Sequence, residues 1–142
     1  MTDAPGSSGM APGAAEPPTL YLMSSLSLYW SDTLAEAKRY PFESLTGYPV
    51  TVEAAEGMFP DARSWAAAWP ALRERYSCGV FLDRDGWVSR GVYAEVCDLA
   101  GMGKRVWWFR SGEPTDRFGF GPGVRGDWAF RYRSVYALPE ED

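Results

Sequence analysis

Short apolar runs alternate with amphipathic stretches along most of this chain. The runs "TLYLMSS", "YPVTVEAA", "SCGVFLD" and "RVWWFR" are apolar or β-branched, and they predict strands near residues 20–23, 50–52, 79–82 and 106–109. The stretches "SDTLAEAKRY", "PDARSWAAAWPALRERY" and "RGVYAEVCDLAGMG" between them have apolar residues at helical spacing. This alternation of strands and helices favours an α/β fold, with the first, third and fourth of these strands parallel.

Several residues sharpen the prediction of individual elements. Ser31 or Asp32 is expected to cap the first helix, and Pro70 is expected to kink the second helix or split it into two pieces. Trp107 and Trp108 are adjacent, so in a strand they face opposite sides of the sheet, and both sides must be covered by helices. The tail "DWAFRYRSVYAL" predicts one more strand, placed at an edge.

The predicted fold is a Rossmann-like, doubly wound, mostly parallel sheet flanked by helices, in a single domain that spans residues 19–138. Residues 1–18 are rich in Gly, Ala, Pro and Ser and predict a disordered leader. They lack the basic and apolar regions of a signal peptide, and no segment approaches the length of a membrane span. We therefore expect a cytoplasmic protein.

Composition removes most kinds of catalytic site. The 142 residues include no histidine, which excludes Ser-His-Asp and Cys-His nucleophile systems and histidine-ligated metals. Two cysteines are too few for a four-cysteine zinc site, so we expect neither a metal nor a cofactor. The net charge of −5 argues against binding to polymeric nucleic acid or to anionic membranes. Carboxylates, hydroxyls, lysine, arginine and the backbone remain as the available chemistry.

Glu95 is the candidate catalytic residue. It lies in "RGVYAEVCDLAGMGKRV", which predicts a helix, a glycine turn and a strand. It flanks the apolar stripe of Val92 and Leu99, in the first turns of the helix, where the helix dipole favours an ionised carboxylate. A partly desolvated carboxylate near a ligand crevice is what a carboxylate nucleophile requires. The alternative is a structural glutamate that pairs with Arg90 or Lys104.

Three segments are expected to meet at the carboxyl ends of the strands, where ligands of such sheets bind. They are "SSLSLYW" after the first strand, the turn after Ala54, and "DRDGWVSRG" after the third strand. Tyr29 is either a rim aromatic or part of a ligand pocket, and Asp83 is either a cap at the end of a strand or a binding group. Trp87, in a predicted loop, is expected to contact a ligand or a partner.

The stretch from "GVFLD" through "RGVYAEVCDLAGMGKRVWWF" resembles the nucleoside 2-deoxyribosyltransferase family and the related nucleotide N-glycosidases. The matching positions are Gly91, Glu95, Gly103 and Lys104, and "YLMSS" is similar to the first strand of the family. The resemblance implies that Glu95 attacks the anomeric carbon of a nucleoside, displaces the base and forms a glycosyl-enzyme ester, which water or another base resolves.

The sequence departs from the family at two positions. Ser89 stands where the family often has a base-binding aspartate. No carboxylate occurs in residues 62–73, where the family often has another aspartate, and Trp65 and Trp69 occupy that region instead. Asp83 and Asp85 are candidates to replace the missing groups.

The sequence therefore predicts an N-glycoside-cleaving enzyme, either a nucleoside or nucleotide hydrolase or a deoxyribosyltransferase, with Glu95 as its nucleophile. If the substrate carries a phosphate, Arg90 or an arginine from the tail is expected to contact it. The candidate substrate-binding residues are Ser24, Tyr29, Asp83, Asp85, Trp87, Ser89, Arg90 and Gly91. The expected partner is a small nucleoside or nucleotide, and the sequence leaves room for a homodimer or a higher homo-oligomer. The alternatives are a catalytically inactive nucleotide-binding module and a protein-interaction domain on the same fold.

Overall fold

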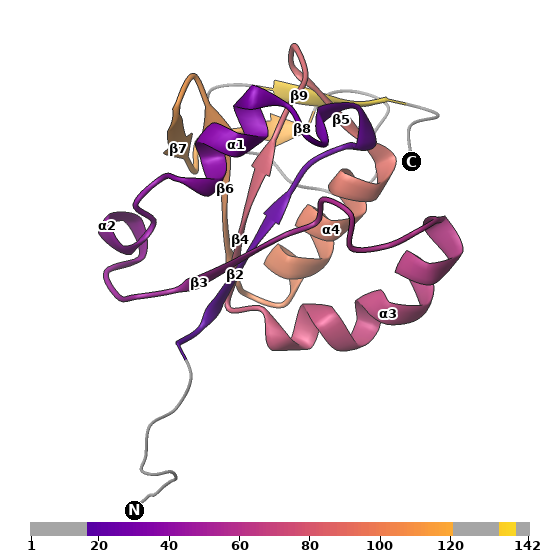
Figure 1. Ribbon diagram of the computed structural model, residues 1–142, viewed down its shortest axis with the longest axis horizontal. Helices are drawn as coiled ribbons and strands as arrows, with labels where there is room; N and C mark the ends of the chain where they lie inside the picture. The colour runs from indigo at the N-terminus through magenta and orange to yellow at the C-terminus, as the bar shows by residue number, and fades with distance from the viewer. Residues whose placement is uncertain (1–16, 121–133, 139–142) are drawn as a thin grey trace, which may run out of the picture.

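A five-stranded sheet lies at the centre of the computed structural model, which describes residues 17–120 and 134–138 (Figure 1). In spatial order its strands are β3 (Thr51–Ala54), β2 (Thr19–Met23), β4 (Cys78–Leu82), β6 (Arg105–Arg110) and β7 (Glu113–Thr115). The first four are parallel to one another, and β7 is antiparallel to β6. The four predicted strands and the parallel arrangement of the first, third and fourth of them are confirmed.

Helices pack on both faces of this sheet (Figure 1). They are α1 (Asp32–Lys38), α2 (Glu43–Thr46), α3 (Ala62–Arg75) and α4 (Arg90–Gly101), with a 3₁₀ turn η1 at Leu26–Leu28. Trp108 packs in the cluster that contains side chains of α3 and α4, whereas Trp107 packs in the cluster that contains side chains of α1. Because neighbouring residues of a strand face opposite ways, this pair shows that both faces are covered, as predicted. The protein is a mixed α/β domain with a mostly parallel sheet.

The ends and interiors of the helices follow local rules with one exception. Ser31 is the N-cap of α1, and its hydroxyl accepts a hydrogen bond from the amide of Leu34 at 3.1 Å. Pro70 lies inside α3, which continues as one helix to Arg75. The predicted alternative of two separate pieces is therefore wrong. A proline removes a single backbone hydrogen bond, and the burial of Trp69 and the partial burial of Leu72 on either side of it hold the helix against the core.

A tight turn creates a strand that the sequence analysis missed. Asp85 and Gly86 have φ angles of 55° and 86°, and Arg84 and Trp87 exchange two backbone hydrogen bonds of 2.8 and 2.9 Å. These are the properties of a type I′ turn, which Asp-Gly favours. The segment predicted as a loop therefore contains strand β5 (Trp87–Ser89).

The tail strand was placed wrongly by the sequence analysis. Strand β9 (Ser134–Leu138) is the middle strand of a second sheet, in the order β5, β9, β8, where β8 is Gly119–Phe120. It is parallel to both neighbours. The prediction of an edge position is wrong because the turn at residues 85–86 supplies an additional strand, β5, on one side of β9.

Gly79, in the middle of β4, allows α4 to lie close to the sheet. A Cβ atom at this position would come within 2.6 Å of the terminal methyl of Met23 and 2.8 Å of a methyl of Leu99. Leu99 is part of α4, so the absence of a side chain at Gly79 helps to set the position of this helix and of Glu95 on it.

Residues 1–16 of the expected leader lie outside the described residues, so the prediction of disorder for them stays a prediction. In the part of the chain that the structure describes, no helix is long and apolar enough to cross a membrane.

Candidate functional site

A cavity of about 100 Å³ lies beyond the carboxyl ends of β2 and β3. Its walls come from the loop after β2, the loop after β3, the beginning of α3 and one residue of α4. The lining residues are Tyr21, Ser24, Leu26, Tyr29, Ala55, Phe59, Pro60, Asp61, Ala62, Trp65 and Glu95. Pockets for whole small molecules begin at roughly 300 Å³, so this cavity holds one ring-sized group, and the remainder of a larger ligand must extend through the mouth.

Glu95 forms part of the cavity floor and is only 5% exposed. Its Oε2 atom accepts two hydrogen bonds, from the hydroxyl of Tyr21 at 2.7 Å and from the indole nitrogen of Trp65 at 2.7 Å. Tyr21 belongs to β2 and Trp65 belongs to α3, so three different elements meet at this carboxylate. Hydrogen bonds to the charged form of an acid favour that form, which offsets part of the cost of burying it.

Glu95 lies in the first turns of α4, as predicted, but not in the very first one. The helix begins at Arg90, and its first turn contains no acidic residue, so Glu95 lies in the second turn. The effect of the helix dipole falls off within the first turn. The hydrogen bonds from Tyr21 and Trp65, rather than the helix N-terminus, are therefore the main local stabilisation of the carboxylate.

Tyr21 is held in a fixed position with its proton attached. Its ring stacks on Tyr76 with a centroid distance of 4.4 Å and an interplanar angle of 5°. Burial raises the pKa of the Tyr21 hydroxyl well above its usual value, and the negative charge of Glu95 raises it further. Tyr21 is therefore a hydrogen-bond donor to Glu95 throughout the physiological pH range.

Ser24 supplies a polar group that the fold itself does not use. The residue follows β2, lines the cavity and is 4% exposed, and its hydroxyl has no hydrogen-bond partner among the described residues. Buried hydroxyls in native proteins nearly always have a partner. An unpartnered one in the wall of a cavity indicates a contact for a bound molecule.

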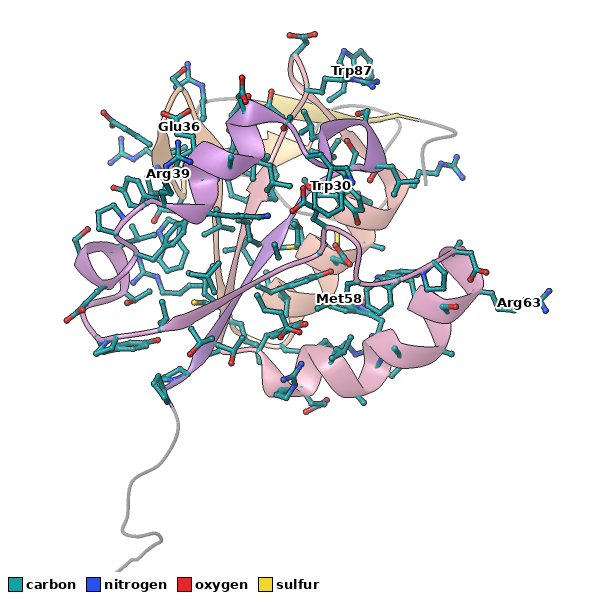
Figure 2. The ribbon with its side chains drawn as sticks, viewed as in Figure 1. Trp30, Glu36, Arg39, Met58, Arg63 and Trp87 are labelled. Atoms are coloured by element: carbon teal, nitrogen blue, oxygen red, sulfur yellow. The ribbon has the colours of Figure 1, made fainter. Side chains whose placement is uncertain are left out.

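The two loops around the cavity are tied to each other. The hydroxyl of Tyr29 donates to the carbonyl oxygen of Ala55 at 3.0 Å, which joins the loop after β2 to the loop after β3. One residue further, the backbone amide of Trp30 donates to the carboxylate of Glu56, which also pairs with Lys38. Trp30 itself is exposed on the surface beside these loops (Figure 2). These contacts hold the two walls together.

Asp61 lies at the mouth of the cavity and begins α3. Its Oδ1 atom accepts a hydrogen bond from the amide of Ser64 at 2.7 Å, so it is the N-cap of the helix. This hydrogen bond lowers the pKa of the Asp61 carboxyl below its usual value, and the group remains ionised at neutral pH. Asp61 stands one residue before the segment 62–73, in which the sequence has no carboxylate.

The loop after β4 does not line this cavity, although most of the predicted substrate-binding residues lie there. Asp83 accepts hydrogen bonds from the amide of Gly86 and from the indole of Trp108, both at 2.6 Å. Asp85 is exposed in the type I′ turn. The Asp83 carboxylate thus supports the β4–β5 hairpin, and neither carboxylate lines the cavity, where it could replace a missing aspartate.

The remaining predicted residues of this segment also lie away from the cavity lining. Ser89 is the N-cap of α4, and its hydroxyl accepts from the amide of Val92 at 3.1 Å. Arg90 is exposed at the start of α4, and Gly91 follows it. Trp87 is 41% exposed and projects from the outer end of the hairpin (Figure 2). Of the predicted site residues, the cavity brings together Ser24, Tyr29 and Glu95.

The Gly-Lys pair of the sequence motif has a structural role here. The ammonium of Lys104 donates to the carbonyl oxygens of Arg73 and Glu74, the last of these at 3.1 Å. These carbonyls belong to the last turn of α3, where backbone oxygens lack helical partners. Lys104 therefore fixes the end of α3, the helix that carries Trp65.

Sequence reasoning missed Tyr21, Trp65 and Asp61 as members of the site. Tyr21 could have been identified from the sequence. It is a tyrosine in an otherwise apolar strand, and the hydroxyl of a buried tyrosine usually has a hydrogen-bond partner. Trp65 is four residues before Trp69 and lies on the same face of α3. The two indoles donate to two carboxylates of α4, Trp65 to Glu95 and Trp69 to Asp98 at 2.8 Å.

Comparisons with known proteins add no assignment to this geometry. No family model matches the chain, and neither a curated protein nor a solved structure matches it. Among the described residues, no group of three Cys, Asp or Glu side chains is placed to hold a metal ion. A function for this chain therefore has to be inferred from the groups that line the cavity.

Proposed function

We propose that this protein cleaves N-glycosidic bonds, with the Glu95 carboxylate as the nucleophile. The observation that carries the proposal is a buried carboxylate on the floor of a cavity, fixed by the donors Tyr21 and Trp65 and accompanied by the unpartnered hydroxyl of Ser24. A structural glutamate does not need a cavity beside it. A nucleophile does, because the reacting carbon must come within about 3–3.5 Å of its oxygen.

The strand order supports a Rossmann-like, doubly wound sheet as the scaffold. Strands β3, β2, β4 and β6 are in the order that begins flavodoxin-like folds, in which the chain switches direction between the first and third strands. In such sheets ligands bind beyond the carboxyl ends of the strands, at the switch point. Tyr21 and Ser24 belong to β2 and the loop that follows it, which is one side of that point.

The chemistry follows from the positions of these groups. A carboxylate oxygen of Glu95 attacks the anomeric carbon, the bond between that carbon and the base nitrogen breaks, and a glycosyl ester forms. Tyr21 and Trp65 hold the carboxylate so that little reorganisation is needed. Water, or another base, then attacks the same carbon and releases Glu95. The cavity holds only one ring of the substrate, so the other ring extends through the mouth.

The resemblance to nucleoside 2-deoxyribosyltransferases and nucleotide N-glycosidases supports the same role for Glu95. Tyr29 and Ser24, which the sequence also assigned to substrate binding, line the cavity with it. Asp61 is a carboxylate at the mouth, and it is the best-placed residue to take over a base-binding function. Asp83 and Asp85 are not part of this proposal.

Mass spectrometry of a trapped intermediate tests the proposal directly. The full-length protein is incubated with a panel of nucleosides and nucleotides, and release of free base is measured. A slow 2-fluoro analogue of the best substrate is expected to add one glycosyl mass to the peptide that contains Glu95. Free-base release without labelling of that peptide would contradict the nucleophile assignment. Binding of a panel member without any base release would favour the inactive nucleotide-binding module instead.

A further inference from the structure

Among the described residues, the charged side chains that line the cavity are all negative. Two of its lining residues, Glu95 and Asp61, are carboxylates, and no lysine or arginine among the described residues lines it. Arg63, the second residue of α3, points away from the protein into solvent (Figure 2). Lys38, near the loop after β2, is paired with Glu56. A phosphate in this cavity would meet two negative charges, whereas a cation would be attracted by both.

The walls are suited to a flat cation. Aromatic side chains of Tyr29, Phe59 and Trp65 line the cavity beside the buried Tyr21. The faces of such rings attract cations through their quadrupoles, and aromatic cages are the usual way in which proteins bind quaternary nitrogen. The ring of Trp65 is fixed by its hydrogen bond to Glu95, so it is in place before a ligand enters. Tyr21 is fully buried and stacked on Tyr76, and it contributes its hydroxyl through Glu95. Acidic and aromatic walls together select a positively charged ring.

The lining residues offer poor proton donors to a departing base. A neutral nucleoside releases its base as an anion unless an acid protonates the base. The pKa of Asp61 is lowered by its hydrogen bond from Ser64, so it is ionised, and the pKa of Tyr21 is raised by burial, so its proton is held and donated to Glu95. A base that carries a positive charge before cleavage leaves as a neutral molecule and needs no acid.

We infer that the substrate of this site is a cationic N-glycoside, in which the ring nitrogen bonded to the sugar belongs to a positively charged heteroaromatic base. This inference rests on the function proposed above. A carboxylate oxygen of Glu95 forms a bond to the anomeric carbon, and the electron pair of the broken C–N bond passes to the base and cancels its charge. Water then cleaves the ester, which yields the free sugar, the Glu95 carboxylate and one proton released to solvent.

Binding of the cation is measured first, with a probe that has no sugar to lose. The full-length protein is titrated with 1-methylnicotinamide, a cation, and with nicotinamide, its neutral counterpart of similar shape. We expect the cation to bind at least about tenfold more tightly, as a cation–π contact and two carboxylates would provide. Equal affinities for the two probes would overturn the inference, whether or not the protein cleaves any nucleoside.

Cleavage is measured next with 7-methylguanosine and guanosine, which share the sugar and differ by one methyl group and one positive charge. Both compounds are assayed at a mildly acidic pH, at which N1 of 7-methylguanosine keeps its proton. Each kcat/KM is divided by the uncatalysed rate of the same compound at that pH, because methylation alone weakens the bond. We expect the corrected value for 7-methylguanosine to be about 10²-fold higher or more, the usual size of a general-acid contribution that only guanosine lacks. Equal corrected values would overturn the cationic class and leave N-glycoside cleavage standing. Tight binding of 1-methylnicotinamide without cleavage of either nucleoside would overturn N-glycoside cleavage and leave selective binding of a cation standing.

A matched pair of variants locates the cation. Asp61→Asn removes the charge at the mouth but keeps an N-cap of equal quality for α3. Asp85→Asn removes the same charge from the exposed turn, and asparagine tolerates the positive φ there. We expect Asp61→Asn to weaken binding of 1-methylnicotinamide about threefold at low salt, with no change in nicotinamide binding, and Asp85→Asn to change neither. An equal effect of the two variants would contradict the placement of the cation in this cavity.

Discussion

Two regions at the carboxyl ends of the parallel strands contain the same kinds of side chain and differ in how those side chains are satisfied. The segment 83–91 after β4 has carboxylates, a serine and a tryptophan, but Asp83 accepts two hydrogen bonds from the fold and Ser89 caps a helix. In the cavity after β2 and β3, the Ser24 hydroxyl has no partner and the Glu95 carboxylate is buried. Residue type and strand end do not separate the two regions. What separates them is whether each polar group already has hydrogen-bond partners within the fold.

The largest expected difference between the regions is in catalysis. Glu95→Gln keeps an oxygen that can accept from Tyr21 and Trp65, so the protein is expected to fold, but an amide is not a nucleophile. Base release should fall by about 10³-fold or more. Asp83→Asn, the corresponding change in the other region, should leave base release near the wild-type rate.

The order of the same two variants should be reversed for stability, since Asp83→Asn is expected to be the less stable one. In Asp83→Asn an amide group replaces one of the two oxygens that accept from Gly86 and Trp108, which should lower the free energy of unfolding by about 1–3 kcal/mol. Urea unfolding and base release are measured on both variants. A Glu95→Gln protein that folds and cleaves at the wild-type rate would end the comparison.

Alkaline pH provides a second difference, because segment 83–91 contains no tyrosine whereas the cavity contains Tyr21. Burial raises the pKa of Tyr21 above its ordinary value of 10.0, and burial likewise raises the pKa of Tyr76, against which it stacks. The folded state then binds these protons more tightly than the unfolded state, so stability is retained below pH 10 and is lost as pH rises above it.

Each such tyrosine should contribute a slope of about 1.4 kcal/mol per pH unit to the free energy of unfolding above pH 10. Tyr21→Phe is expected to remove one such contribution, measured by urea unfolding between pH 9 and about 11. Tyr48→Phe, at an exposed position, is the control and should leave the slope unchanged. An unchanged slope in Tyr21→Phe would show that its hydroxyl is not enclosed in the folded protein.

Smaller effects are expected for the two serines. The change at Ser24 should affect substrate binding, and the change at Ser89 should affect stability. Ser24→Ala removes a buried hydroxyl that has no partner, so it should leave stability unchanged or slightly higher while weakening substrate binding by up to about tenfold. Ser89→Ala removes the cap of α4 and should cost about 1 kcal/mol of stability without a change in KM. Thermal unfolding and KM are measured for both. Equal effects of the two substitutions on thermal unfolding and on KM would show that the Ser24 hydroxyl does not identify a binding site.

The comparison also shows what the sequence predicts about the fold. The parallel strands were predictable because each is an apolar run of four to six residues between helices. Strands β5 and β7, of three residues each, are too short to show a period. Their only signals were the Asp-Gly pair at 85–86 and the Ser-Gly pair at 111–112, whose residues all have positive φ. Missing β5 also led to the wrong placement of β9 at an edge.

For the site, the sequence led to Glu95, Ser24 and Tyr29, because each lies on an element or loop that the strand order brings to one end of the sheet. It did not lead to Trp65. Whether an indole of α3 reaches a carboxylate of α4 depends on how the two helices pack, and helical spacing alone only shows that Trp65 and Trp69 share a face. The other members of the site were identified from burial and from hydrogen-bond partners, which the sequence does not supply.

The smallest expected effect concerns Trp87, the residue of segment 83–91 that the sequence most strongly suggested as a contact. Trp87 is in β5, and its side chain projects from the outer end of the hairpin (Figure 2). Trp87→Thr keeps a strand-favouring residue in register with Tyr136 of β9, so the protein should fold, and KM should be unchanged. Trp65→Phe is the matched change in the cavity: it keeps an aromatic ring and removes the donor to Glu95, so base release should fall by about tenfold or more. Both variants are assayed for unfolding and for base release under the same conditions. A rise in KM for Trp87→Thr at unchanged stability would place substrate against the hairpin, and the two regions would then form one site.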